Sequence, residues 1–139
     1  MIRIATKDDL NTVYRLIKQL STHKFTKKQF EECYLHNILK GHVLVCERNH
    51  IVCGCIVFNI HYYLHFSHKS AEVVNLVVDE NVRGNGIGKN LLASFEKIAT
   101  NSGCKCLEVD SSKHRESAHR FYLQEGYECN HLKFTKKLG

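Results

Sequence analysis

Apolar residues recur every three or four positions in several parts of the chain, the spacing that places them on one face of an α-helix. The segments with this spacing cover residues 10–20, 26–40, 87–101 and 116–125. The inward positions of the longest one are Ile87, Leu91, Leu92, Phe95, Ile98 and Ala99. The pattern therefore predicts about four amphipathic helices.

Residues that start and stop helices stand where these segments begin and end. Thr6 is followed three positions later by Asp9, which is the pattern of a capping box, and Thr26 can cap the second helix. Gly41 and Gly103 follow the last apolar positions of the second and third segments, where glycine commonly ends a helix.

Other segments are rich in Val, Ile and Cys, a composition that favours β-strands. They cover residues 2–5, 42–47, 51–59, 72–79 and 104–110. The connection at residues 48–50 is short enough to join the second and third of these segments as an antiparallel hairpin. Gly54 is a candidate position for a β-bulge. Residues 127–130 and 132–137 are predicted to close the sheet as a further hairpin. Residues 61–70, polar and aromatic, are predicted to form a loop with strand only at its edges.

The order of these segments predicts one α+β domain over residues 1–139, with a single mixed, mostly antiparallel sheet flanked by about four helices. Within it, the strand at 72–79, the glycine-rich turn, the helix at 87–101 and the strand at 104–110 form a crossover unit. A chain of 139 residues is the usual size of one domain.

Composition excludes several classes of protein. Hydrophobic residues make up 43% of the chain and charged residues 24%, which is ordinary for a globular protein. No apolar run approaches the roughly 20 residues of a membrane-spanning helix, and Lys7 and Asp8 interrupt the N-terminus too early for a signal peptide. We therefore expect a cytoplasmic protein with no membrane partner.

The net charge and the cysteines say less about the class of protein than the overall composition does. The net charge of +6 makes an anionic partner plausible, but the Lys and Arg residues are scattered. Seven cysteines are present, and those in predicted strands are expected to be core thiols. These cysteines are Cys46, Cys53, Cys55, Cys104 and Cys106.

The turn between the strand at 72–79 and the helix at 87–101 carries glycines at three alternate positions, Gly84, Gly86 and Gly88. Without side chains there, successive backbone N–H groups are open at the positive end of a helix, an arrangement that can cradle a pyrophosphate. Arg83 and Lys89 can add positive charge. The spacing fits neither the dinucleotide fingerprint nor the Walker loop. The alternative is a tight connection without a ligand, for which one glycine would be enough.

Two motifs in this order give the sequence a specific resemblance. Residues 83–88, Arg-Gly-Asn-Gly-Ile-Gly, resemble the Arg/Gln-x-x-Gly-x-Gly/Ala signature of the GNAT acetyltransferases. Residues 118–127 resemble that family's Ala-x-x-x-Tyr followed by Gly-Phe/Tyr. The resemblance also covers the opening strand with Asp8 and Asp9, and so nearly the whole chain. It implies an N-acetyltransferase that moves an acetyl group from acetyl-CoA to a primary amine.

The resemblance also implies how the co-substrate is held. Its pantetheine arm would pair with the strand around Leu76, Val77 and Val78, through backbone hydrogen bonds, and a backbone N–H there would polarise the thioester carbonyl. The turn would hold the pyrophosphate. The residues assigned to this turn are Arg83, Gly84, Asn85, Gly86, Ile87, Gly88 and Lys89. Many relatives have Asn where this chain has Arg115, which would reach a cofactor phosphate or only face solvent.

Two residues are candidates for proton transfer. An alkylammonium has a pKa of about 10 and must lose a proton before it attacks, and Glu72, on the strand leading to the cofactor, is the candidate base. The alternative for Glu72 is a solvated residue at a strand start. By resemblance, Tyr122 would protonate the departing thiolate, the alternative being a packed aromatic residue beside Phe121.

Of the features of the proposed reaction, the acceptor amine is the one that the sequence determines least. Residues 61–72 and 117–136 are similar to the bacterial aminoalkylphosphonate N-acetyltransferases, whose substrate carries an amine beside a phosphonate. His61, His65 and His68, with Lys69, could bind that anion or a divalent metal, or could be surface residues of a mobile loop. Amino sugars, aminoglycosides, polyamines and peptide amino termini are not excluded, because substrate loops vary on a shared scaffold.

Two other functions are kept as alternatives. One is an acetyltransferase acting on a protein or peptide amine, and the other is a basic nucleic-acid-binding module without catalysis. The chain lacks a recognition helix with clustered Arg and Lys and lacks the aromatic and basic strand motif of single-stranded RNA binders, so no nucleic-acid partner is expected. A homodimer is left open.

Overall fold

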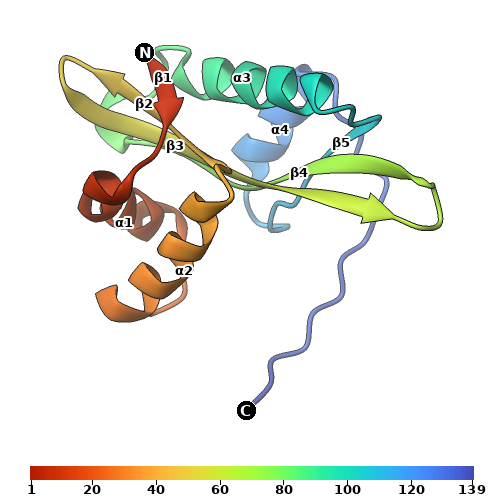
Figure 1. Ribbon diagram of the computed structural model, residues 1–139, viewed down its shortest axis with the longest axis horizontal. Helices are drawn as coiled ribbons and strands as arrows, with labels where there is room; N and C mark the ends of the chain where they lie inside the picture. The colour runs from red at the N-terminus through yellow and green to blue at the C-terminus, as the bar shows by residue number, and fades with distance from the viewer.

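The computed structural model describes residues 1–139 and places one five-stranded sheet between two layers of helices (Figure 1). The strands are β1 (Ile2–Ile4), β2 (Val43–Arg48), β3 (Ile51–Tyr63), β4 (His68–Val78) and β5 (Cys106–Val109). The helices are α1 (Leu10–Leu20), α2 (Lys27–Leu39), α3 (Ile87–Asn101) and α4 (Glu116–Gln124), with short 3-10 turns at Lys7–Asp9 and Glu80–Val82. None of the helices has both the length and the apolarity needed to cross a bilayer.

The strands lie in chain order, and every neighbouring pair is antiparallel except β4 and β5, which run parallel through the α3 crossover. One core lies between the sheet and α3 with α4, where Phe58 and Phe95 are fully buried. A second core lies on the opposite face under α1 and α2, around Val13 and Leu16. The predicted fold class is confirmed, and alternate residues of β2, β3 and β4 pack into the two cores.

Two register shifts shape the sheet. The first lies between Cys46 and Glu47, opposite Gly54 and Val52, next to the glycine that the sequence marks for a bulge. A Cβ atom on Gly54 would lie 3.0 Å from Ile87 Cγ2 and 3.2 Å from Leu91 Cδ1. Gly54 therefore lets the start of α3 approach the sheet closely.

The second register shift places the extra residue Val74 on β4, opposite the step from Val57 to Phe58. β5 pairs with β4 only from Ser70 to Val73, whereas β3 pairs with β4 as far as Val78. From Val74 onward one edge of β4 is therefore free of a neighbouring strand.

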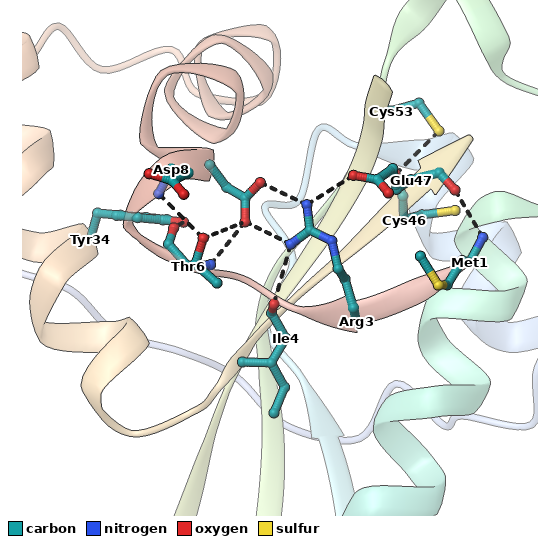
Figure 2. Close-up of polar contacts among 10 residues, drawn as sticks. Met1, Arg3, Ile4, Thr6, Asp8, Tyr34, Cys46, Glu47 and Cys53 are labelled. Atoms are coloured by element: carbon teal, nitrogen blue, oxygen red, sulfur yellow. Dashed lines mark hydrogen bonds and ion pairs between the residues drawn. The ribbon is translucent and has the colours of Figure 1, made fainter. Parts of the chain in front are cut away.

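A cluster of polar contacts ties β1 to the start of α1 (Figure 2). The Asp9 carboxylate accepts hydrogen bonds from both terminal nitrogens of Arg3, at 2.8 and 2.9 Å, and from the Thr6 N–H at 2.8 Å. Arg3 also contacts Glu47 on β2 at 3.0 Å. The Arg3 hydrogen bonds lower the pKa of Asp9, although its burial opposes them. The capping box predicted at Thr6 and Asp9 is confirmed.

We expect Asp9→Asn to lower the free energy of unfolding by about 2 kcal/mol, because the buried side chain at position 9 would no longer be a charged acceptor for the hydrogen bonds from Arg3. The folded pKa of Asp9 lies below its unfolded value, so its contribution is complete above the unfolded value and is lost as the pH falls through the folded one. Urea unfolding at neutral pH and at pH about 3 measures both effects. Asp8→Asn, at an exposed neighbouring carboxylate, is the control and should change stability by about 0.5 kcal/mol or less.

The structure corrects three sequence-based expectations. Most of residues 61–70 belong to strands, because β3 continues to Tyr63 and β4 begins at His68. Residues 127–139 contain no strand, and Leu132 and Phe134 are exposed: Tyr127 still packs in the first core and Lys133 contacts Asp110, and only the end of the chain extends away from the rest of the molecule (Figure 1). All seven cysteines are free, but only Cys46, Cys53 and Cys55 are buried, whereas Cys106 is exposed on the edge strand β5.

Candidate active site

The glycine-rich turn presents a run of unused backbone donors. No backbone N–H from Arg83 to Lys89 donates to an acceptor within the protein, although Asn90 N–H already donates to the Gly86 carbonyl as α3 begins. Gly86 occupies the position before α3 with φ +76°, a left-handed conformation that favours glycine. Successive N–H groups at the positive end of a helix of 15 residues can bind an anion such as a pyrophosphate.

The space around this turn fits such a ligand. A Cβ atom on Gly84 or Gly86 would have no heavy atom within 4 Å, so the region over the amides is open. Arg83 donates from Nε to the Val78 carbonyl at 3.1 Å, which fixes the turn to the end of β4. The Asn85 amide donates to the Val82 carbonyl at 2.8 Å. Lys89 lies in the exposed first turn of α3, and Ile87 is buried against the sheet.

The free edge of β4 leads into this turn. Asp79 N–H donates to the Cys53 carbonyl of β3 at 2.8 Å, and strand alternation then directs the backbone groups of Val77 toward β3 as well. The backbone groups of Leu76 and Val78 consequently point to the opposite, unpaired side. The Leu76 N–H and carbonyl and the Val78 N–H can therefore pair with an extended ligand, while the Val78 carbonyl is held by Arg83. The Val77 side chain packs in the second core.

A further polar group lies just beyond the point where β4 and β5 stop pairing, at Ser111. Its hydroxyl is buried and has no hydrogen-bond partner, two residues beyond the end of β5. A buried hydroxyl of this kind is normally satisfied, so a bound ligand or a water is the expected partner. Together, the bare amides, the open space and this hydroxyl fit an extended ligand that carries phosphates.

Glu72 lies in the middle of β4 and not at a strand start, two residues before the extra residue Val74. Its Oε1 atom lies 2.8 Å from His61 Nε2 on β3. An ionised carboxylate only accepts hydrogen bonds, so His61 Nε2 carries the proton in this pair. The two side chains are 26% and 31% exposed, so the carboxylate is both held in place and open to a ligand.

A second acidic group lies beside this pair. Glu108 on β5 is directly opposite Glu72 in the parallel register. It accepts hydrogen bonds from the Tyr63 hydroxyl, at 3.3 Å, and from the buried Ser70 hydroxyl. Burial, then the contact with Glu108, raises the pKa of Tyr63 to about 12, so Tyr63 stays a donor at neutral pH. Tyr63 also stacks on His61, with ring centroids 5.3 Å apart.

Tyr122 lies on the other side of the sheet, on α4. It is 9% exposed and packs in the first core against Phe121 and Tyr127. Burial raises the pKa of Tyr122, and the charge of Arg115 partly opposes that rise. Tyr122 is therefore protonated at neutral pH, as a proton donor must be, and Arg115 lies near enough to act on it electrostatically.

The other candidate histidines are not gathered around Glu72. His65 is exposed at the tip of the β3–β4 hairpin, 5.2 Å from the Tyr63 ring, and His68 contacts the Lys69 carbonyl. Lys69 donates to the Ser102 carbonyl at the end of α3. No group of three or more His, Cys, Asp or Glu side chains is arranged to hold a metal ion.

Sequence reasoning missed Tyr63, Ser70 and Glu108. The signal was present as polar residues two positions apart, Ser70 with Glu72 and Glu108 with Asp110, which strands place on one face. The loop predicted for residues 61–70 hides this pattern at Tyr63 and Ser70, and the pairing of β5 with β4, which places Glu108 beside Glu72, is not visible in the sequence.

A free strand edge that leads into an amide-lined turn can hold an extended ligand that carries phosphates, and the comparisons with known proteins show the family to which such a fold belongs. A model of the acetyltransferase (GNAT) family matches residues 10–127. An aminoalkylphosphonate N-acetyltransferase of Salmonella typhimurium is 36% identical over 139 residues, which cover 99% of this chain and 90% of that protein. The chain belongs to the GNAT family and is an acetyl-CoA-dependent N-acetyltransferase.

Solved structures agree in fold. A transcriptional regulator from Bacillus halodurans superposes with a TM-score of 0.89 at 20% identity, over 99% of both chains. An aminoglycoside N-acetyltransferase in complex with CoA superposes with a TM-score of 0.87 at 20% identity, over 99% of this chain and 93% of that one. At this identity the likeness concerns the fold alone.

Proposed function

We propose that this enzyme acetylates the primary amine of a small molecule that also carries an anionic group, with an aminoalkylphosphonate as the preferred class. The observation that carries the proposal is the Glu72 carboxylate, held at 2.8 Å by His61 beside the point where β4 and β5 separate. The Salmonella relative, similar over nearly the whole chain, supports the phosphonate class.

In this proposal Glu72 receives the ammonium end of the acceptor and removes a proton from it. His61 orients the carboxylate by donating to Oε1. Acetyl-CoA, when bound, supplies a thioester whose carbonyl carbon is attacked by the freed amine, so that a C–N bond forms and the C–S bond breaks. Tyr122, held protonated by burial, supplies the proton to the departing thiolate, and the second proton lost by the nitrogen as the amide forms replaces it. Glu72 then releases its own proton to solvent.

The co-substrate would be held by backbone groups. Leu76 offers an N–H and a carbonyl and Val78 an N–H on the free edge of β4, and these groups can pair with an extended arm. The amides from Arg83 to Lys89 would bind the pyrophosphate, and Arg115 lies on the Tyr122 side, where it can reach a phosphate. Glycine at 84 and 86 keeps those amides uncovered.

A panel of acceptors tests the proposal. The panel includes aminomethylphosphonate, 2-aminoethylphosphonate, an aminoglycoside, spermidine and a short peptide with a free amino terminus. Release of the CoA thiol gives kcat/KM for each, with an amine-free blank because Cys33, Cys106 and Cys129 are exposed free thiols. We expect the phosphonates to have the highest kcat/KM, by about tenfold or more over the other amines. A higher value for the peptide or the aminoglycoside would overturn the substrate class.

A further inference from the structure

The segment after α4 brings a lysine to the face of the sheet that carries Glu72. Lys133 forms an ion pair with Asp110, which follows the last residue of β5. Asp110 is held to β4 by its own N–H, which donates to the Val73 carbonyl at 3.3 Å. Side chains alternate along a strand, so Asp110 lies on the same face as Glu108, and Glu108 is opposite Glu72. Lys133 therefore lies on the face of the sheet that carries Glu72 and Glu108, near the point where β4 and β5 separate.

The charges agree with this placement. The pKa of Lys133 is raised, first by its hydrogen bond to Asp110 and then, more weakly, by the charges of Asp110 and Glu72. Lys133 is 64% exposed and Asp110 31% exposed, so their ion pair is screened by water and opens at little cost. A ligand with a doubly charged phosphonate can compete with the single Asp110 carboxylate for the ammonium of Lys133.

Three other groups that can carry positive charge, Lys69, His65 and Arg115, are less suited to an anion near Glu72. Lys69 is turned toward Ser102 at the end of α3, and His65 is at the hairpin tip. Arg115 lies on α4, on the Tyr122 side of the sheet. In aminomethylphosphonate and 2-aminoethylphosphonate, only one or two carbons separate the amine from the phosphonate. The cation that binds the phosphonate must therefore lie close to the base, and Lys133 meets this condition.

We propose that Lys133 binds the anionic end of the acceptor while Glu72 receives its ammonium end, so that Lys133 selects anionic amines over neutral ones. The inference rests on the proposed function, because it assumes that the acceptor amine is directed to Glu72. Asp110 is then a positioning residue that keeps the lysine at the site when no acceptor is bound. Neutral amines gain nothing from Lys133.

The test compares 2-aminoethylphosphonate with 2-methoxyethylamine, an uncharged amine of similar length, in the wild type and in Lys133→Gln and Lys133→Arg. We expect Lys133→Gln to raise the KM for the phosphonate about tenfold or more, with kcat changed less, and to leave kcat/KM for the neutral amine unchanged. Lys133→Arg should restore most of the phosphonate KM. Lys136→Gln is the matched control, because Lys136 is exposed on the same segment and makes no hydrogen bond or ion pair.

Several results would overturn this inference without touching the proposed function: an equal loss for both amines, an unchanged KM for the phosphonate, or the same loss in Lys136→Gln. If the wild type acetylates neither amine, the proposed function fails on its own. Calorimetric titration of 2-aminoethylphosphonate then decides the binding role of Lys133, since weaker binding to Lys133→Gln than to Lys136→Gln supports it and equal binding refutes it.

Discussion

Replacing Glu72 with Gln is expected to lower kcat about a hundredfold or more while leaving the dissociation constant for acetyl-CoA unchanged. The amide has nearly the shape of the carboxylate and can still contact His61, but it cannot take a proton from the ammonium of the acceptor. Steady-state kinetics with a saturating amine measure kcat, and calorimetry measures acetyl-CoA binding.

The control for this variant is Glu31→Gln, which changes an exposed carboxylate on α2, far along the chain from the site, and should leave kcat unchanged. A companion variant, Tyr122→Phe, removes the proposed proton donor without emptying the core position. If Glu72→Gln and Tyr122→Phe both turn over at the wild-type rate, the assignment of the base and the acid is wrong even though the family is not in doubt.

Placing valine at Gly86 is expected to raise the dissociation constant for acetyl-CoA about tenfold or more. The residue has φ +76°, and a branched side chain there would both strain the backbone and stand among the open amides. The dissociation constant can be measured by calorimetry with acetyl-CoA, with the folded state checked by circular dichroism.

Gly41→Val is a matched control for the effect of strain. Gly41 follows α2 with φ +71° and, like Gly86, has no heavy atom within 4 Å of an added Cβ atom. Both variants should lose about 1–2 kcal/mol of folding free energy, but only the change at Gly86 should weaken acetyl-CoA binding. Equal dissociation constants for the two variants would show that the turn does not hold the co-substrate.

The local elements could be predicted because short-range contacts determine them. The capping boxes at Thr6 and Thr26 form within one turn of chain, and Gly41 and Gly103 both have positive φ at the end of a helix. The glycine-rich turn has the same character, because its open amides follow from the absence of side chains at alternate residues.

The long hairpin of β3 and β4 differs from the loop predicted for residues 61–70 for a physical reason. Sequence patterns reveal a strand when one of its faces is apolar and buried, but here the face with His61, Tyr63, Ser70 and Glu72 forms a polar site. The opposite error occurred at residues 132–137, where alternating apolar residues predicted a strand that has no neighbouring strand to pair with.

By itself, the sequence determined the helices, their caps, the amide-lined turn and the family resemblance, because each depends on residues near one another in the chain. Only the tertiary structure decided that His61 meets Glu72, that Glu108 lies beside that pair, and that Lys133 reaches Asp110. These contacts join residues that are 11, 36 and 23 positions apart in the chain. Strand register and the path of the last segment, which no local pattern encodes, bring them together.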